Sequence, residues 1–76
     1  MASVGTVREF HADSGWGVVD GPDVPGGCWV HFSAIDMPGY RSLVAGQEVT
    51  FTAERANQDG YTYRALKVWS SYRERE

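Results

Sequence analysis

Residues 16–32, WGVVDGPDVPGGCWVHF, decide the fold of this chain. Two short runs within them, residues 16–20 and 28–32, are rich in β-branched and aromatic residues, which favour extended backbone. Between the two runs, residues 21–27 contain three glycines and two prolines, a composition that is typical of a loop. The stretch therefore predicts two neighbouring strands joined by a loop.

The same stretch also assigns faces, because successive side chains of a strand point to opposite sides of the sheet. The positions expected to face the core are Val19, Cys28 and Val30. The positions expected to face outward are Trp16, Val18, Trp29 and His31. Large rings grouped on the outer side of adjacent strands usually mark a binding surface.

The rest of the chain continues the pattern of short strands separated by turn signals. Three further strands are predicted over residues 5–10, 48–54 and 61–69, with Val7, Val49 and Phe51 facing the core. Turns are predicted at residues 12–15 and 57–60, and a short helical turn near residues 33–36, capped by Ser33 and ended by Pro38-Gly39. Closing a sheet removes its exposed edges, so we expect an all-β fold: a five-stranded antiparallel closed β-barrel.

Length and composition restrict what such a barrel can do. The chain has 76 residues, enough for one domain, which we expect over residues 1–69, followed by a polar, frayed tail over residues 70–76. A single cysteine, no long apolar run and no secretory signal favour a soluble protein of the cytoplasm, without membrane contact. The net charge of −3 argues against purely electrostatic binding to duplex DNA, but three Trp, four Tyr and three Phe provide surfaces for base stacking.

Several linked segments resemble the bacterial cold-shock protein family, in the family's order and spacing. Residues 14–19, SGWGVV, resemble its first ribonucleoprotein motif, and residues 28–33, CWVHFS, resemble its second. Residues 33–43 resemble the loop that follows in the family, and residues 46–51, GQEVTF, resemble its fourth strand. The resemblance covers roughly residues 4 to 69.

The resemblance implies an oligonucleotide-binding (OB) barrel with its nucleic-acid site on the second and third strands. Carried across by position, the expected contact residues are Arg8, Phe10, Trp16, Trp29, His31, Phe32 and Tyr40. The implied function is binding of single-stranded RNA or DNA by a monomer that acts as an RNA chaperone or as a regulator of transcription or translation. Stacking on rings suits this role because every base has a π-face, and Gly15 and Gly17 beside Trp16 are expected to let the sugar–phosphate strand approach.

Three positions depart from the family pattern, and they argue for weaker binding. Glu9 stands where the family usually has Trp, Val18 where it has Phe, and Ser14 where it has Lys. One stacked base contributes about 1–3 kcal/mol, so the loss of two platforms is expected to cost about 2–6 kcal/mol. The indoles of Trp16 and Trp29 replace phenyl rings and recover part of this.

Other interpretations of the same residues remain open or find little support. Phe10 and Phe32 are also candidates for filling the barrel end, and Tyr40 for packing within its loop. His11, His31 and Cys28 are one ligand short of a structural zinc site, and nothing pairs a nucleophile with a base, so we expect no metal, no cofactor, no small-molecule substrate and no catalysis. An alternative function is a protein-interaction module that keeps the barrel but has lost useful affinity for nucleic acid.

Overall fold

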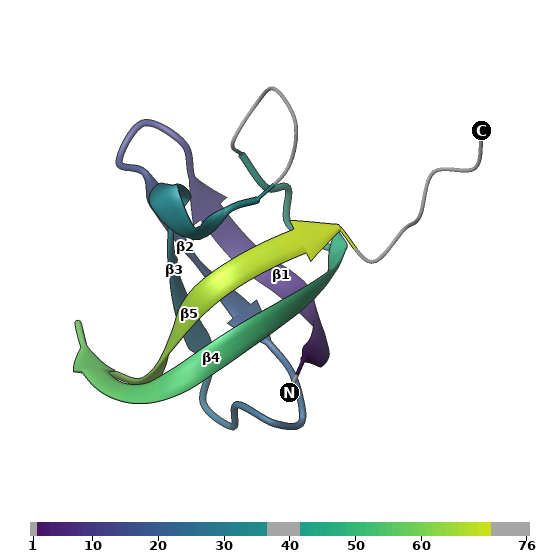
Figure 1. Ribbon diagram of the computed structural model, residues 1–76. Coiled ribbons are helices and arrows are strands. Elements are labelled where there is room, and N and C mark those ends of the chain that lie inside the picture. The colour runs from purple at the N-terminus through teal and green to yellow at the C-terminus, as the bar shows by residue number, and fades with distance from the viewer. Residues whose placement is uncertain (1, 37–41, 71–76) are drawn as a thin grey trace.

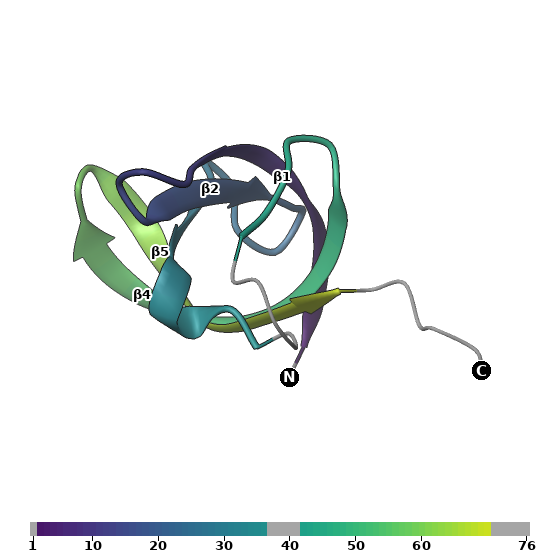
Figure 2. The same ribbon diagram turned by 90° about the horizontal axis from the view of Figure 1, so that it is seen from above.

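Five strands form a closed barrel in the computed structural model, which describes residues 2–36 and 42–70 (Figures 1 and 2). The elements are β1 (Ser3–His11), β2 (Trp16–Asp20), β3 (Cys28–His31), the 3₁₀ turn η1 (Phe32–Ala34), β4 (Glu48–Gln58) and β5 (Tyr61–Ser70). Around the barrel the strands follow the order β1-β2-β3-β5-β4. The predicted five-stranded closed barrel is confirmed.

One of the five strand pairings is parallel, whereas the pattern of short strands predicted an antiparallel barrel. β3 pairs with β5 in parallel, and the other four pairings are antiparallel. An odd number of strands cannot alternate direction all the way round a closed ring, so one parallel pairing is required. The parallel pairing joins β3 to β5, because β4 follows β3 in the chain but pairs with β1, and β5 then closes the barrel between β4 and β3.

The core consists mainly of valines that point inward from all five strands. Every residue predicted to face the core is at most 2 % exposed: Val7, Val19, Cys28, Val30, Val49 and Phe51. Val68 and Ala65 contribute from β5, while Ile35 and Leu43 contribute from the segments between β3 and β4. Each fully buried side chain of this size stabilises the fold by about 1.5–3 kcal/mol. Burial also raises the pKa of the Cys28 thiol to about 12, so the sulfur stays protonated and inert.

The β4–β5 hairpin is longer than predicted and extends beyond the barrel, at the lower left of Figure 1. The prediction ends the fourth strand at Glu54. In the structure the strand continues to Gln58, because its backbone pairs with β5 as far as Gln58 opposite Tyr61. Asp59 and Gly60 form the tight turn with φ values of 49° and 87°, both in the left-handed region that such two-residue turns require.

The predicted helical turn after β3 is present, but it begins one residue earlier and has a different cap. It spans Phe32–Ala34, and the side chain of His31, rather than Ser33, accepts the first free backbone N–H. Pro38-Gly39 and, apart from Ser70, the tail at 70–76 lie outside the described residues. No helix in the described part of the chain has the length and apolar character needed to cross a membrane.

Candidate functional site

A row of five aromatic and imidazole rings crosses the outer side of strands β1 to β3 and ends on η1. In spatial order the ring row consists of His11, Trp16, Trp29, His31 and Phe32. The successive ring centroids are 4.6, 6.5, 5.9 and 4.7 Å apart. The two indoles lie within 17° of parallel, so they present a broad flat surface rather than two isolated rings. All of these side chains are at least partly exposed.

Strand register explains why these rings meet. Trp16 on β2 lies opposite His31 on β3 and opposite His11 on β1, and antiparallel partners point to the same side of the sheet. Trp29 lies two positions before His31 and therefore shares its face. The predicted outward orientation of Trp16, Trp29 and His31 is what the structure shows, and the two indoles are on the same side of the molecule.

A bulge in β1 determines which β1 residues join this face. Val7 pairs with Val19, but the next pair joins Glu9 to Val18, so Arg8 is an extra residue in the ladder. Beyond the bulge the alternation is reversed: Phe10 lies opposite inward-facing Gly17 and packs against the core. Simple alternation places Phe10 outward, whereas the structure places Glu9 and His11 there.

His11 is the member of the ring row that the sequence analysis did not name as a site residue. A signal for it exists in the sequence, because the four-residue turn at 12–15 closes β1 and β2 with His11 facing Trp16. Counting back from the turn, rather than forward from Val7, passes no bulge and gives the correct face.

The comparisons with known proteins agree with this architecture. The family model described as the 'Cold-shock' DNA-binding domain matches residues 3–71. The chain belongs to the cold-shock domain family. It is 37% identical to the major cold shock protein CspA of Bacillus cereus over 90% of this chain and all of that protein. It is 44% identical to cold shock protein 1 of Lactiplantibacillus plantarum, over 71% of this chain and 80% of that protein. With the cold shock-like protein CspB of Escherichia coli it shares 46% identity, over 66% of this chain and 70% of that protein.

Beneath the ring row of this cold-shock domain lies a valine that faces outward but is not exposed. Val18 is only 1 % exposed, although its alternation points it away from the core. It sits between Glu9 and Trp29 in the cross-strand ladder, and the backbone of Gly27 packs against it. Val18 therefore supports the neighbouring indole instead of offering a surface of its own.

Two glycines shape the edges of the cold-shock domain's ring row. Gly15 has a φ of 79° and lies under Phe32, whose backbone N–H donates to the Gly15 carbonyl. Gly17 faces inward, and a Cβ there would come within 2.4 Å of the Glu9 carbonyl oxygen and 2.5 Å of the Phe10 ring. Gly17 therefore permits close packing against β1. The sequence had instead led us to expect that Gly17 lets the sugar–phosphate backbone of a ligand approach.

Hydrogen bonds fix the orientation of His31. The backbone N–H of Ser33 donates to His31 Nδ1 at 3.2 Å, and Ser33 Oγ lies 2.8 Å from the same nitrogen. Because a backbone N–H can only donate, Nδ1 must act as an acceptor, and the proton of the neutral ring is on Nε2. His31 thus offers both a ring face and an N–H donor. By contrast, the indole Nε1 of Trp29 is buried without a hydrogen-bond partner among the described residues, so packing holds that ring.

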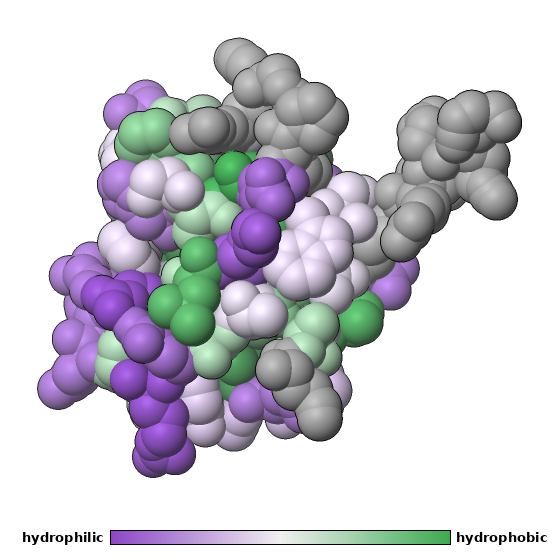
Figure 3. All heavy atoms as spheres, in the orientation of Figure 1, coloured by the Kyte–Doolittle hydropathy of each residue, from purple (hydrophilic) through white to green (hydrophobic). Residues whose placement is uncertain are grey.

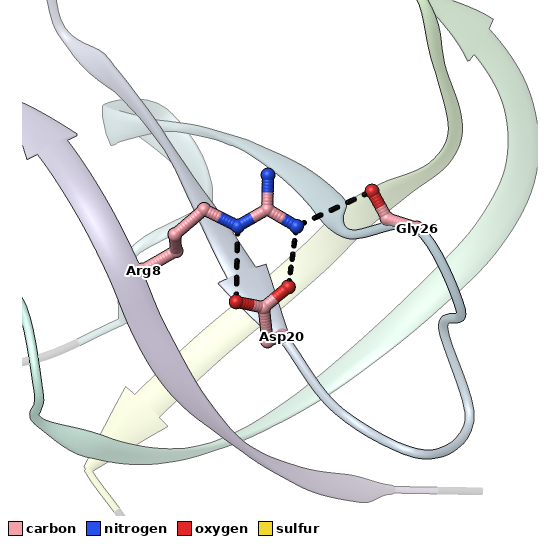
Figure 4. Close-up of polar contacts among 3 residues, drawn as sticks. All are labelled: Arg8, Asp20 and Gly26. Carbon is pink, nitrogen blue, oxygen red and sulfur yellow. Dashed lines mark hydrogen bonds and ion pairs between the residues drawn. The ribbon is translucent and has the colours of Figure 1, made fainter.

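Charged groups at the rim of the ring row are paired with one another. Arg8 Nε and Nη2 donate to the Asp20 carboxylate at 3.0 and 2.5 Å, and Nη2 also lies 3.4 Å from the Gly26 carbonyl oxygen (Figure 4). The hydrogen bond from Arg8 holds the pKa of Asp20 below its ordinary value. Arg64, which pairs with Trp29 across the β3–β5 ladder, donates to Glu54. Within residues 2–36 and 42–70, the two arginines that border the row, Arg8 and Arg64, are therefore charge-compensated.

The structure brings together four of the seven contact residues expected from the sequence, namely Trp16, Trp29, His31 and Phe32. Phe32 is 43 % exposed and so does not fill the barrel end. Arg8 lies beside Val18 but is engaged by Asp20, and Phe10 packs against the core cluster. Tyr40 lies outside the described residues.

Proposed function

We propose that this cold-shock domain binds single-stranded RNA or DNA by stacking bases on the ring row. The observation that carries the proposal is the set of five neighbouring rings on one outer face, centred on the near-parallel indoles of Trp16 and Trp29. A soluble barrel has no structural need for large rings on its outer side, whereas unstacked bases are bound by such rings with little sequence preference. The names of the relatives and of the matching family model support the same class of function.

The geometry suggests what each part of the site does. The indoles stack bases, the exposed Phe32 ring receives a further base at the β3 end, and His31 Nε2–H donates to a base edge. Binding several unpaired nucleotides stabilises the open strand by mass action, which opposes hairpin formation without ATP. We therefore infer a non-catalytic RNA chaperone or regulator of transcription or translation that acts as a monomer in the cytoplasm.

Phosphate contacts are expected to contribute less than the rings. Arg8 reaches a phosphate only when its ion pair with Asp20 opens, and Arg64 is held in the same way by Glu54. Tyr40 is retained as a proposed contact on the resemblance alone, while Phe10 acts from beneath by packing the β1 end of the barrel.

The direct test is a titration of the protein with a short uracil- or thymine-rich single strand at low salt, following tryptophan fluorescence. Stacking on Trp16 and Trp29 is expected to quench the emission in a saturable manner. A matched hairpin of the same composition, with its bases already paired, is the control and is expected to bind much more weakly. Absence of quenching at high micromolar strand would refute the proposal.

The paired rim favours one alternative strongly enough to be tested, namely a protein that docks on the ring row. Compensated arginines reduce the attraction of the face for phosphate, and a protein partner does not depend on that attraction. Under this alternative the oligonucleotide titration fails, while the rings remain exposed in the free protein. Success of the titration excludes it as the main function of the face.

A further inference from the structure

Glu9 places a carboxylate on the same outer face as the ring row. The bulge at Arg8 rotates β1 so that Glu9 lies opposite outward-facing Val18, next to the pair formed by His11 and Trp16. On simple alternation from Val7, Glu9 faces the core, where an unpaired carboxylate is excluded by its desolvation cost. The bulge thus resolves that conflict and brings an acidic group to the edge of the stacking surface.

His11 links this carboxylate to the rings. Its Nε2 lies 3.6 Å from Glu9 Oε2, and its ring centroid lies 4.6 Å from that of Trp16. One side of the imidazole therefore contacts the indole while one of its nitrogens faces the carboxylate. The Glu9 side chain is 43 % exposed. A carboxylate has two oxygens and about four acceptor positions, so the contact with His11 leaves acceptors directed to solvent.

The chemistry of a carboxylate discriminates between bases. An ionised carboxylate only accepts hydrogen bonds, so it suits a base edge that carries an exocyclic amino group, as in cytosine N4, adenine N6 or guanine N2. Uracil and thymine carry a carbonyl oxygen in place of this amino group, and that oxygen repels the carboxylate. Their one donor on the pairing edge, N3–H, lies between two carbonyl oxygens, so it offers the carboxylate a weaker contact. Because stacking fixes the plane of a base on Trp16, the edge of that base is the part that faces a group at the rim of the row.

We propose that Glu9, positioned by His11, selects an amino-bearing base at the β1 end of the ring row, in preference to uracil or thymine. The inference rests on the proposed function, since a base must first stack before its edge is sensed. Glu9 is then a specificity-determining residue that hydrogen-bonds to the base edge, and His11 a positioning residue that also extends the stacking surface.

The test compares two hexanucleotides, oligodeoxycytidine and oligodeoxyuridine, whose single-ring bases differ at one edge. Affinities are measured by tryptophan fluorescence near neutral pH for the unmodified chain, Glu9→Gln and Glu48→Gln. Glu48 is exposed on β4, so its substitution gives the same change in net charge away from the ring row. The unmodified chain and Glu48→Gln are expected to bind the cytidine strand about tenfold more tightly, the size of one charge-assisted hydrogen bond. Glu9→Gln is expected to bring the ratio close to one.

The possible outcomes separate the inference from the function on which it rests. Equal binding of both strands by the unmodified chain, or tighter binding of the uridine strand, overturns the inference while the proposed function stands. An unchanged ratio in Glu9→Gln overturns it as well. Failure of every strand to bind removes the proposed function and the inference with it. Thermal unfolding of the two variants shows whether a change in the ratio of affinities follows a loss of fold. A purely structural role of Glu9 would weaken the binding of both oligonucleotides equally and leave that ratio unchanged.

Discussion

The outer side of β1, β2 and β3 differs from the outer side of β4 and β5, although both cover the same valine core. The first carries the ring row, in which each ring contacts the next. On the second, Thr52 lies opposite Lys67 and Glu54 opposite Arg64. Figure 3, which views the β4–β5 side, shows hydrophilic surface along the distal hairpin and small, separate hydrophobic areas above it. The core is built from inward residues, so most outward ones are free to differ between the two sides, and the proposed function rests on those of the ring row.

Exposure alone does not distinguish the two sides. Leu66 on β5 is 54 % exposed, which is more than the 43 % of Phe32 in the ring row. Leu66 is the extra residue where the register between β4 and β5 shifts, so it projects from an irregular position. What distinguishes the ring row is the contact of flat rings across adjacent strands, which is the arrangement that the proposed stacking of successive bases requires.

The largest difference between the two sides is expected in the affinity for single-stranded nucleic acid, after the substitution Trp16→Ala. The substitution removes one of the two near-parallel indoles of the row and should weaken binding of a single-stranded oligonucleotide by about 1–3 kcal/mol, or about 5- to 150-fold. Leu66→Ala, which removes an exposed apolar side chain from the other side, should leave the affinity unchanged. Fluorescence anisotropy of a labelled strand measures both, because it does not depend on the tryptophan that is lost. Equal affinities of the two variants would show that bases bind elsewhere.

A smaller effect, on stability rather than binding, is expected from Val18→Ala. Val18 is buried beneath the row, and removing its two methyl groups should lower the free energy of unfolding by about 2 kcal/mol. Val44→Ala is the matched control, because Val44 is 69 % exposed and should lose almost nothing. Urea unfolding of the two variants provides the measurement. Similar urea midpoints for the two variants would mean that the packing of Val18 against Trp29 and Gly27 contributes little to stability.

The sequence predicted the core better than it predicted the site. All six valine, phenylalanine and cysteine positions expected in the core are buried, because period-two alternation and apolar character are both visible in a sequence. The register bulge at Arg8 is not visible there, and it turns Phe10 inward, whereas the resemblance implied a nucleic-acid contact at Phe10. Val18 followed the predicted orientation, but its burial depends on the loop at Gly27 and on Trp29, which local pattern does not reveal.

The salt dependence of binding measures how much the charged groups at the rim of the ring row contribute to affinity. Each phosphate contacted contributes a slope of about −0.7 to the logarithm of the affinity against the logarithm of the salt concentration. Because Arg8 and Arg64 are engaged by Asp20 and Glu54, we expect one or two phosphate contacts and a slope between about −0.7 and −1.4. Oligonucleotide titrations over a tenfold range of salt measure it. A much steeper slope would show that binding opens the ion pairs at the rim.

The smallest effect is expected from Asp20→Asn, which releases Arg8 from its carboxylate partner. The guanidinium then becomes available to one phosphate, so binding should tighten slightly and the salt slope should become steeper by about 0.7. Asp13→Asn, in the exposed turn between β1 and β2, makes the same change in net charge and should not steepen the slope. If both variants steepen the slope equally, net charge rather than Arg8 is responsible.

The stability of Asp20→Asn gives an independent check through pH. The pKa of Asp20 is lowered in the folded protein, so its ion pair stabilises the fold above the ordinary value of 3.8, and this stabilisation is lost as the pH falls through the lowered value. The stabilisation is small because both side chains are nearly half exposed. Urea unfolding should therefore show the variant slightly less stable than the unmodified chain at neutral pH and the difference closing in acid. A difference that persists at the lowest pH would assign the loss of stability to the amide itself rather than to the ion pair with Arg8.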